Sequence, residues 1–194
     1  MKKMVPVLFI AVTVVVIGLA GCGRNVKQVA NEAMEKEFEN APEWVLSGSP
    51  DEAFAAVGSA HIGKGGMQFA RTEAMSHGRG ELARQVAVKV KGLVNSFSQQ
   101  IGIGGDQTLD AFSKQVSKLV TDETLSGSRQ KDLWISPSSD VYVLMVLDKA
   151  DVQASVRRQV VHSYQQDSAK WQAFQANNGN EQLDREIKEM FVSP

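Results

Sequence analysis

The residue with the most distinctive chemistry in this sequence is its single cysteine, Cys22. Because no second cysteine exists, no intrachain disulfide can form. Lys2 and Lys3 and then an apolar stretch, residues 5–19, precede Cys22. A positive start, a short apolar run and small residues before a cleavage point are typical of a secretory signal peptide. The apolar run is shorter than the roughly 20 residues that a membrane-spanning helix needs.

Cys22 closes the run Leu19-Ala20-Gly21-Cys22, which resembles the lipobox of bacterial lipoprotein precursors. The resemblance implies that the Cys22 thiol receives a diacylglycerol, that residues 1–21 are removed, and that the new amino group is acylated. Two or more acyl chains hold a protein stably on a membrane, at about 0.8 kcal/mol per buried CH₂. By the sorting rule of Gram-negative lipoproteins, Gly23 in place of aspartate implies the outer membrane, with the domain in the periplasm. A secretory signal without lipidation is the alternative, and it would leave a free thiol.

Composition limits the remaining classes of function. Removing residues 1–21 takes two lysines and no acid from the 21 basic and 22 acidic residues, so the mature net charge is −3. This balance offers no basic footprint for nucleic acid. The 173 remaining residues suit one domain with extensions, whose stability must come from packing or from oligomerisation.

Catalytic and metal-binding patterns are missing from the sequence. The histidines, His61, His77 and His162, are far apart and lack the spacing of metal ligands. No nucleophile motif occurs, and the carboxylates are not paired as a general acid and base. We therefore expect no catalytic residue, no metal and no cofactor, although an enzyme with an unfamiliar site is a third and weaker hypothesis.

One glycine-rich loop could hold an anion. It consists of Gly63, Lys64, Gly65 and Gly66, and it precedes a predicted helix. Backbone amides at a helix N-terminus bind phosphate well, and Lys64 could assist them. The spacing is not that of a phosphate loop, and a turn that needs positive φ explains the same glycines.

Basic residues also gather on the helix that follows this loop. Those that could engage lipid phosphate or a glycan are Arg71, Arg79, Arg84, Lys89 and Lys91. Interleaved Glu73 and Glu81 favour a solvated helix face instead. The larger aromatic residues fit a core or a subunit contact better than a ligand cage; they are Trp134, Trp171, Phe174 and Phe191. The stretch Trp171–Phe191 is our best candidate for an interaction surface.

Hydrophobic periodicity predicts the elements that position these residues. Residues 23–42 are a polar tether with helical tendency, after which Trp44 and Val45 dock on the domain. The small residues of the first strand predict that a helix crosses closely over it. The run Val141–Leu147 is apolar throughout and predicts a central strand covered on both faces. In order, the predicted strands and helices are strand Ala53–Ile62, helix Met67–Gln100, helix Gln107–Asp122, strand Thr124–Ile135, strand Val141–Asp148, helix Ala150–Ala176 and helix Glu181–Phe191.

This order predicts an α+β fold: a small antiparallel sheet crossed by a long helix, with a C-terminal helical extension. The expected division of the chain is a signal peptide over 1–21, a lipidated tether over 22–50, an α+β domain over 51–149 and a helical extension over 150–194.

Several short runs resemble the lipoprotein-twenty family of bacterial outer-membrane lipoproteins, over about residues 41–150. They are Ala41–Val45, Gly58–Gly63, Phe69–Ala74, Gly80–Gln85, Leu125–Ser128 and Val141–Leu144. The resemblance implies a dodecin-like domain that tends to assemble, and it brings no catalytic residues. The family includes a flagellar lipoprotein that builds a disk around the motor at the outer membrane.

The leading hypothesis is a non-enzymatic outer-membrane lipoprotein with a structural or scaffold role in the cell envelope. It would bind the membrane through acyl chains on Cys22, and would self-associate as a homo-oligomer or dock envelope or flagellar-motor proteins. The alternative is a periplasmic binding module for a small anionic or amphiphilic envelope ligand, which would use Lys64 and the glycine loop.

Overall fold

A computed structural model describes residues 26–48, 54–103 and 106–190 of the chain. The expected signal peptide, Cys22, Gly23 and Phe191 lie outside these residues. The contacts divide the chain into two units, Met1–Glu39 and Asn40–Pro194.

The first unit contains one described helix, α1 (Val26–Phe38). This confirms the helical tendency predicted for the polar residues that follow Cys22. The Met34 side chain of α1 is 65% exposed.

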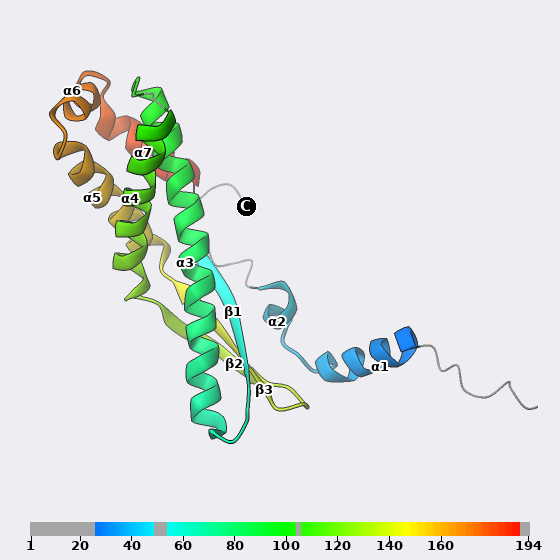
Figure 1. Cartoon of the computed structure of the whole chain (residues 1–194). Helices are drawn as coiled ribbons and strands as arrows, with labels where there is room; N and C mark the ends of the chain where they lie inside the picture. Colours follow the sequence, from blue (N-terminus) through cyan, green and yellow to red (C-terminus); the bar gives the residue numbers. More distant parts are fainter. Residues whose placement is uncertain (1–25, 49–53, 104–105, 191–194) are drawn as a thin grey trace, which may run out of the picture. The chain divides into compact units, whose positions relative to one another are not determined.

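The second unit has the predicted α+β fold (Figure 1). Three antiparallel strands form one sheet, in the order β1-β3-β2. Its elements in chain order are α2 (Glu43–Ser47), β1 (Phe54–His61), α3 (Gly66–Gln100), α4 (Asp106–Leu125), β2 (Arg129–Ile135), β3 (Asp140–Leu147), α5 (Lys149–Gln165), α6 (Ser168–Ala176) and α7 (Gly179–Met190).

Strand β3 lies at the centre of the sheet and is covered on both faces, as predicted. Val143 and Met145 join the buried cluster that includes the inner side of α3. Leu144 and Val146 point to the opposite face, and they are buried too. The short helix α2 lies on that opposite face, because its Trp44 Nε1 donates to Asp132 Oδ2 at 2.8 Å and Asp132 pairs with Leu144.

The predicted docking of Trp44 and Val45 is thereby confirmed, since Val45 is buried as well. The helical form of this segment, α2, was not predicted from the sequence. Five residues are too few for a hydrophobic period to become visible.

Helix α3 crosses β1 at very short range, as the small residues of that strand predicted. A Cβ atom at Gly58 would lie less than 3.0 Å from the carbonyl oxygen of Ala74 and from the amide nitrogen of Gly78. Ala74 and Gly78 are themselves buried on α3. The backbones of helix and strand therefore meet with no side chain between them, which only glycine at position 58 allows.

Half of α3 extends beyond the sheet. Its 35 residues span about 52 Å at 1.5 Å per residue, whereas the eight residues of β1 span about 26 Å. The far half of α3 is covered by α4, α5, α6 and α7 (Figure 1). The C-terminal helices thus complete a second, all-helical part of the same core, and Phe174, Leu183 and Ile187 are buried there.

A cluster of aromatic rings fills this helical part. Tyr164 of α5 contacts Phe97 and Phe174 edge-on or tilted, with ring centroids 5.5 Å apart in both pairs. The Ser98 hydroxyl donates to the Val94 carbonyl at 2.6 Å, so the Tyr164 hydroxyl is the donor in its bond to Ser98. Burial raises the pKa of Tyr164 to about 12, which keeps the hydroxyl protonated.

One predicted strand boundary is wrong. The sequence predicts a strand from Thr124, but Thr124 and Leu125 end α4, and β2 begins at Arg129. The Thr124 hydroxyl donates to the Val120 carbonyl at 2.8 Å, so a residue type that favours strands is satisfied inside the helix.

The single helix predicted over Ala150–Ala176 is also wrong, because it is two helices, α5 and α6. The break lies at Asp167, whose side chain accepts the backbone N–H groups of Ala169 and Lys170 at 3.1 Å. This is an N-cap, which starts a new helix in a new direction. The other predicted boundaries differ from the structure by a few residues.

We predict that Gly58→Ala destabilises the fold strongly, by about 3 kcal/mol or more, because the added methyl group meets backbone atoms that cannot rotate away. Chemical denaturation followed by circular dichroism measures the loss of free energy of unfolding.

Gly80→Ala is the matched control. A Cβ at Gly80 meets nothing within 4 Å, and the residue lies inside α3. This variant should gain about 0.5–1 kcal/mol through helix propensity. Equal effects of the two substitutions would show that the close crossing is not what position 58 requires.

Candidate functional site

The predicted lipid attachment at Cys22 lies outside the described residues and stays a prediction. Among the helices of the described ranges, none is long and apolar enough to cross a bilayer.

The glycine loop forms the turn between β1 and α3. Gly66 N–H donates to the Gly63 carbonyl at 3.0 Å, and Gly66 has a φ of 76°, in the left-handed region that glycine favours. Gly65 is the residue before the first turn of α3, and Lys64 is exposed. This geometry supports a turn as the reason for the glycines, while anion binding by Gly63, Lys64, Gly65 and Gly66 stays a prediction.

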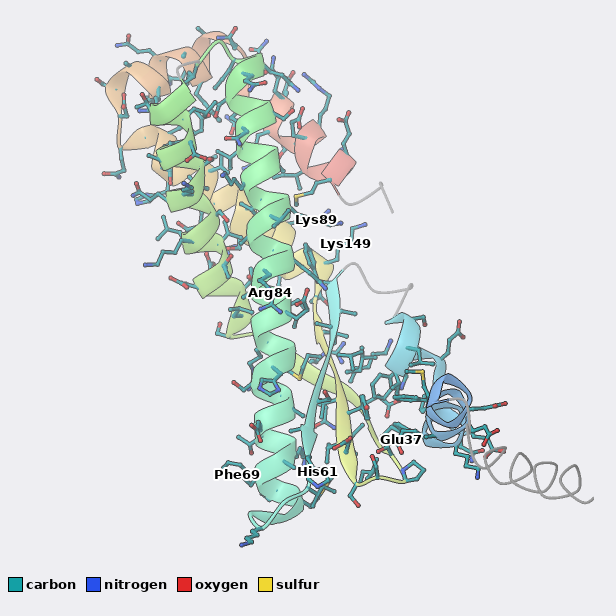
Figure 2. The ribbon with its side chains drawn as sticks, turned by 45° about the vertical axis from the view of Figure 1, so that its right-hand side comes forward. Glu37, His61, Phe69, Arg84, Lys89 and Lys149 are labelled. Atoms are coloured by element: carbon teal, nitrogen blue, oxygen red, sulfur yellow. The ribbon has the colours of Figure 1, made fainter. Side chains whose placement is uncertain are left out.

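The three histidines lie on different elements. His61 lies at the end of β1, and its Nδ1 is 2.8 Å from Oδ1 of Asp140. Figure 2 shows His61 near the start of α3, where Phe69 lies. His77 Nδ1 is 2.8 Å from the Ser59 carbonyl oxygen, and His162 is on α5. No group of three metal-ligating side chains was found among the described residues.

The outer edge of β1 is occupied by side chains of α3. Gln85 Nε2 donates to the Ala55 carbonyl at 3.0 Å, and His77 holds the Ser59 carbonyl. On the other edge, β2 carries charged residues and an irregular register between Gln130 and Asp132. Occupied, charged or bulged edges oppose the addition of a further strand.

The basic residues of α3 contact different parts of the domain. Arg71 donates to Gln130 at 2.9 Å and Arg79 donates to Ser128 at 3.1 Å, so both are bound to the β2 side. The Lys89 ammonium lies over the Phe54 ring, 5.6 Å from its centroid. Arg84 and Lys91 instead line a groove that α3 shares with α4.

That groove, between α3 and α4, encloses about 490 Å³. Its apolar residues are Ala83, Ala87 and Val88 of α3, and Val88 is 72% exposed. Helix α4 adds two lysines that sequence reasoning missed, Lys114 and Lys118. They come from a second helix, so only the fold brings them beside the basic residues of α3.

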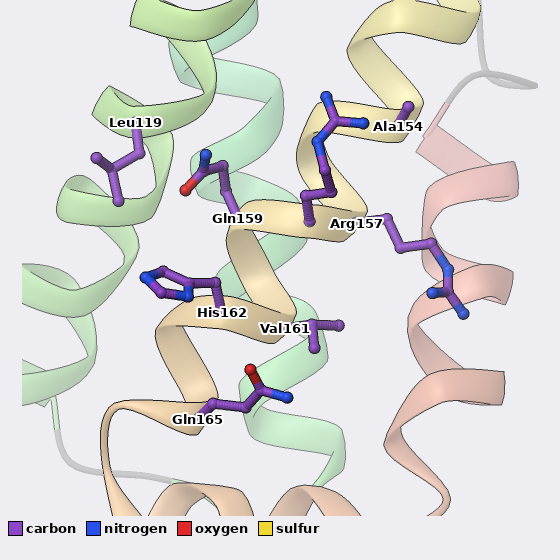
Figure 3. Close-up of a pocket in the computed structure, with 8 residues that line it drawn as sticks. Leu119, Ala154, Arg157, Gln159, Val161, His162 and Gln165 are labelled. Atoms are coloured by element: carbon purple, nitrogen blue, oxygen red, sulfur yellow. The ribbon is translucent and has the colours of Figure 1, made fainter.

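A second groove lies on the other side of α4, against α5, and it encloses about 790 Å³ (Figure 3). Leu119 of α4 faces Gln159 and His162 of α5 across it, while Arg157 turns toward α7. Arg157 is fixed there by Asp184, at 2.8 Å. Helix α4 therefore forms a ridge with an open apolar groove on each side.

Three of the cations beside the α3–α4 groove are paired within the chain, and two of them share one carboxylate. Asp110 bonds both Lys91 and Lys114 at 2.7 Å. Lys114 and then Lys91 lower the pKa of Asp110 to about 2, so this carboxylate stays ionised at neutral pH. Arg84 donates to Glu81 through Nε at 3.0 Å.

Glu123 fixes α4 to α5, and sequence reasoning missed this role. Its carboxylate accepts from Ser155 at 2.8 Å, Gln159 at 2.9 Å and Arg158 at 2.5 Å. These bonds, with Gln159 contributing most and Arg158 and Ser155 following, lower the pKa of Glu123 to about 2. The three partners recur along α5 at helical spacing, which is the signal that the sequence held.

We predict that Glu123→Ala lowers the free energy of unfolding by about 1 kcal/mol, a modest value because the side chain is 35% exposed and solvent screens it. The pKa of Glu123 falls from 4.5 to about 2 on folding, so its contribution is present above pH 4.5 and is lost as the pH falls toward 2. Denaturant titrations over this pH range should therefore show a flatter acid limb for the variant, meaning that its free energy of unfolding falls less on acidification than that of wild type.

Glu73→Ala, at an exposed position of α3, is the control and should leave the acid limb unchanged. Identical acid limbs for wild type and Glu123→Ala would contradict the assigned role of Glu123.

Comparison with protein families gives one match. The model of the LPP20 lipoprotein family matches residues 42–148, from α2 to the end of β3. This confirms the resemblance to the lipoprotein-twenty family, which is not a known enzyme family. A search of curated proteins returned no match. Because the matched segment covers more than half of the chain, the protein belongs to the LPP20 lipoprotein family.

Proposed function

We propose that this protein is a non-enzymatic lipoprotein of the outer membrane, with a structural or docking role in the cell envelope. The carrying observation is the LPP20 lipoprotein domain, preceded in the sequence by the lipobox-like run that ends at Cys22. Acyl chains on Cys22 anchor the chain, and Gly23 after the cysteine directs it to the outer membrane with the domain in the periplasm.

The role in the envelope is self-association or the docking of partner proteins. Two features of the domain support contacts through helices rather than through the sheet. The edges of β1 and β2 are occupied, charged or bulged, and the two grooves beside α4 leave Val88 and Leu119 exposed. Association with the flagellar motor is the sharpest form of this proposal, and it comes from the family resemblance alone.

A second candidate function is the binding of a small anionic or amphiphilic envelope ligand. The observation that favours it is the α3–α4 groove, which combines apolar residues with Lys91, Lys114 and Lys118. Lys64 and the glycine loop, beside the exposed Met67 and Phe69 of α3, are the site that the sequence suggested for such a ligand.

Metabolic labelling with a palmitate analogue tests the anchor. Wild type should carry the label and sediment with the outer membrane. Cys22→Ser should carry no label, because the acceptor thiol is gone. Gly23→Asp should keep the label but move to the inner-membrane fraction.

Gly23→Ser is the matched control and should behave as wild type. An unlabelled wild type, or a label that survives Cys22→Ser, would contradict the proposed anchor. An unchanged location of Gly23→Asp would contradict the proposed sorting only.

Light scattering after gel filtration tests the role, with residues 24–194 as the sample. A discrete oligomer is the expected result, and it supports self-association. A monomer at every concentration would argue for partner docking or for the ligand-binding alternative.

A further inference from the structure

The outward side of α4 is a continuous exposed stripe. Its residues recur at helical spacing and are Ala111, Gln115, Lys118 and Asp122, all of them exposed. Lys118 and Asp122 also line the α3–α4 groove, and the neighbouring Leu119 lines the α4–α5 groove, so the stripe is the crest of the ridge that α4 forms.

Two charges on this crest have no ion pair. Lys91 and Lys114 share Asp110, and Arg84 pairs with Glu81, as described above. Lys118 and Asp122 form no salt bridge within the part of the chain that the structure describes. This lysine and this aspartate present one positive and one negative charge, one helical turn apart.

Such a pair is complementary to itself. When two copies of α4 lie antiparallel about a two-fold axis midway between residues 118 and 122, each lysine faces the aspartate of the other copy. The two ion pairs are then related by symmetry, as an isologous interface requires. Leu119, which is 37% exposed, lies beside this axis, and Val88, which is 72% exposed, flanks the neighbouring groove.

We propose that the α4 crest and its two grooves bind a second copy of this chain, antiparallel about that two-fold axis. The inference rests on the self-association half of the proposed function and assigns it a surface. The occupant is a second copy, because Lys118 and Asp122 are complementary in charge to the same two residues on another copy. The protected sheet edges oppose association by strand addition, which favours a contact through helices.

Charge reversal tests the proposed surface on the mature chain, residues 22–194, with Cys22→Ser so that no acyl chain is added. In the proposed dimer, each single reversal, Lys118→Asp or Asp122→Lys, places like charges opposite one another at both symmetry-related contacts. Each should raise the dissociation constant at least about tenfold, because like charges across an interface are strongly unfavourable.

The double variant restores both pairs and should return the dissociation constant to near its wild-type value. Sedimentation at low ionic strength gives the dissociation constants.

The matched control is the same pair of reversals at Arg185 and Glu189 of α7. These residues are exposed, have the same charges and the same four-residue spacing, and lie outside the proposed surface. Each of these reversals also places like charges four residues apart on one helix, as each single reversal in α4 does. Because they lie outside the proposed surface, they should leave the dissociation constant unchanged. Thermal melting of every variant checks that the fold is retained.

A monomeric wild type, an oligomer indifferent to residues 118 and 122, or a double variant that fails to recover would overturn the proposed surface. Palmitate labelling and outer-membrane location do not depend on α4. An oligomer that forms through another surface would therefore overturn this inference and leave the proposed function standing.

Discussion

The structure depends on the contact between α3 and β1 at Gly58. Backbone meets backbone there, with Ala74 and Gly78 on the helix side. This contact sets the depth at which α3 lies on the sheet, and the close packing of Met145 against Gly78 follows from it. Because α3 is about twice as long as the strands, its position on the sheet also fixes where the helical half of the core is built.

The sequence was sufficient to predict the fold class, since it depends on strong local signals. The apolar run of β3, the small residues of β1 and the hydrophobic periodicity sustained along α3 each identified the element in which they occur. The break at Asp167 was missed because an N-cap inside a helical stretch is a weak signal beside continuous periodicity. Lys114 and Lys118 could not be joined to Arg84 and Lys91 from sequence, because these residues meet only after α4 folds back along α3.

Many charged side chains near the candidate surfaces are bound to other groups of the same domain. Arg71, Arg79 and Lys89 of α3 are among them. Glu123 is likewise bound within the domain, where it joins α4 to α5. The two apolar grooves and the crest between them are open to other molecules.

The side chains on the β1 edge have a consequence for the membrane-anchored form that we propose. Molecules held in one leaflet diffuse in two dimensions, and they meet one another far more often than at the same copy number in free solution. An open strand would then be a hazard, because repeated encounters favour irreversible cross-strand stacking. With His77 and Gln85 holding the Ser59 and Ala55 carbonyls, crowding on the bilayer would favour reversible helix contacts over this kind of aggregation.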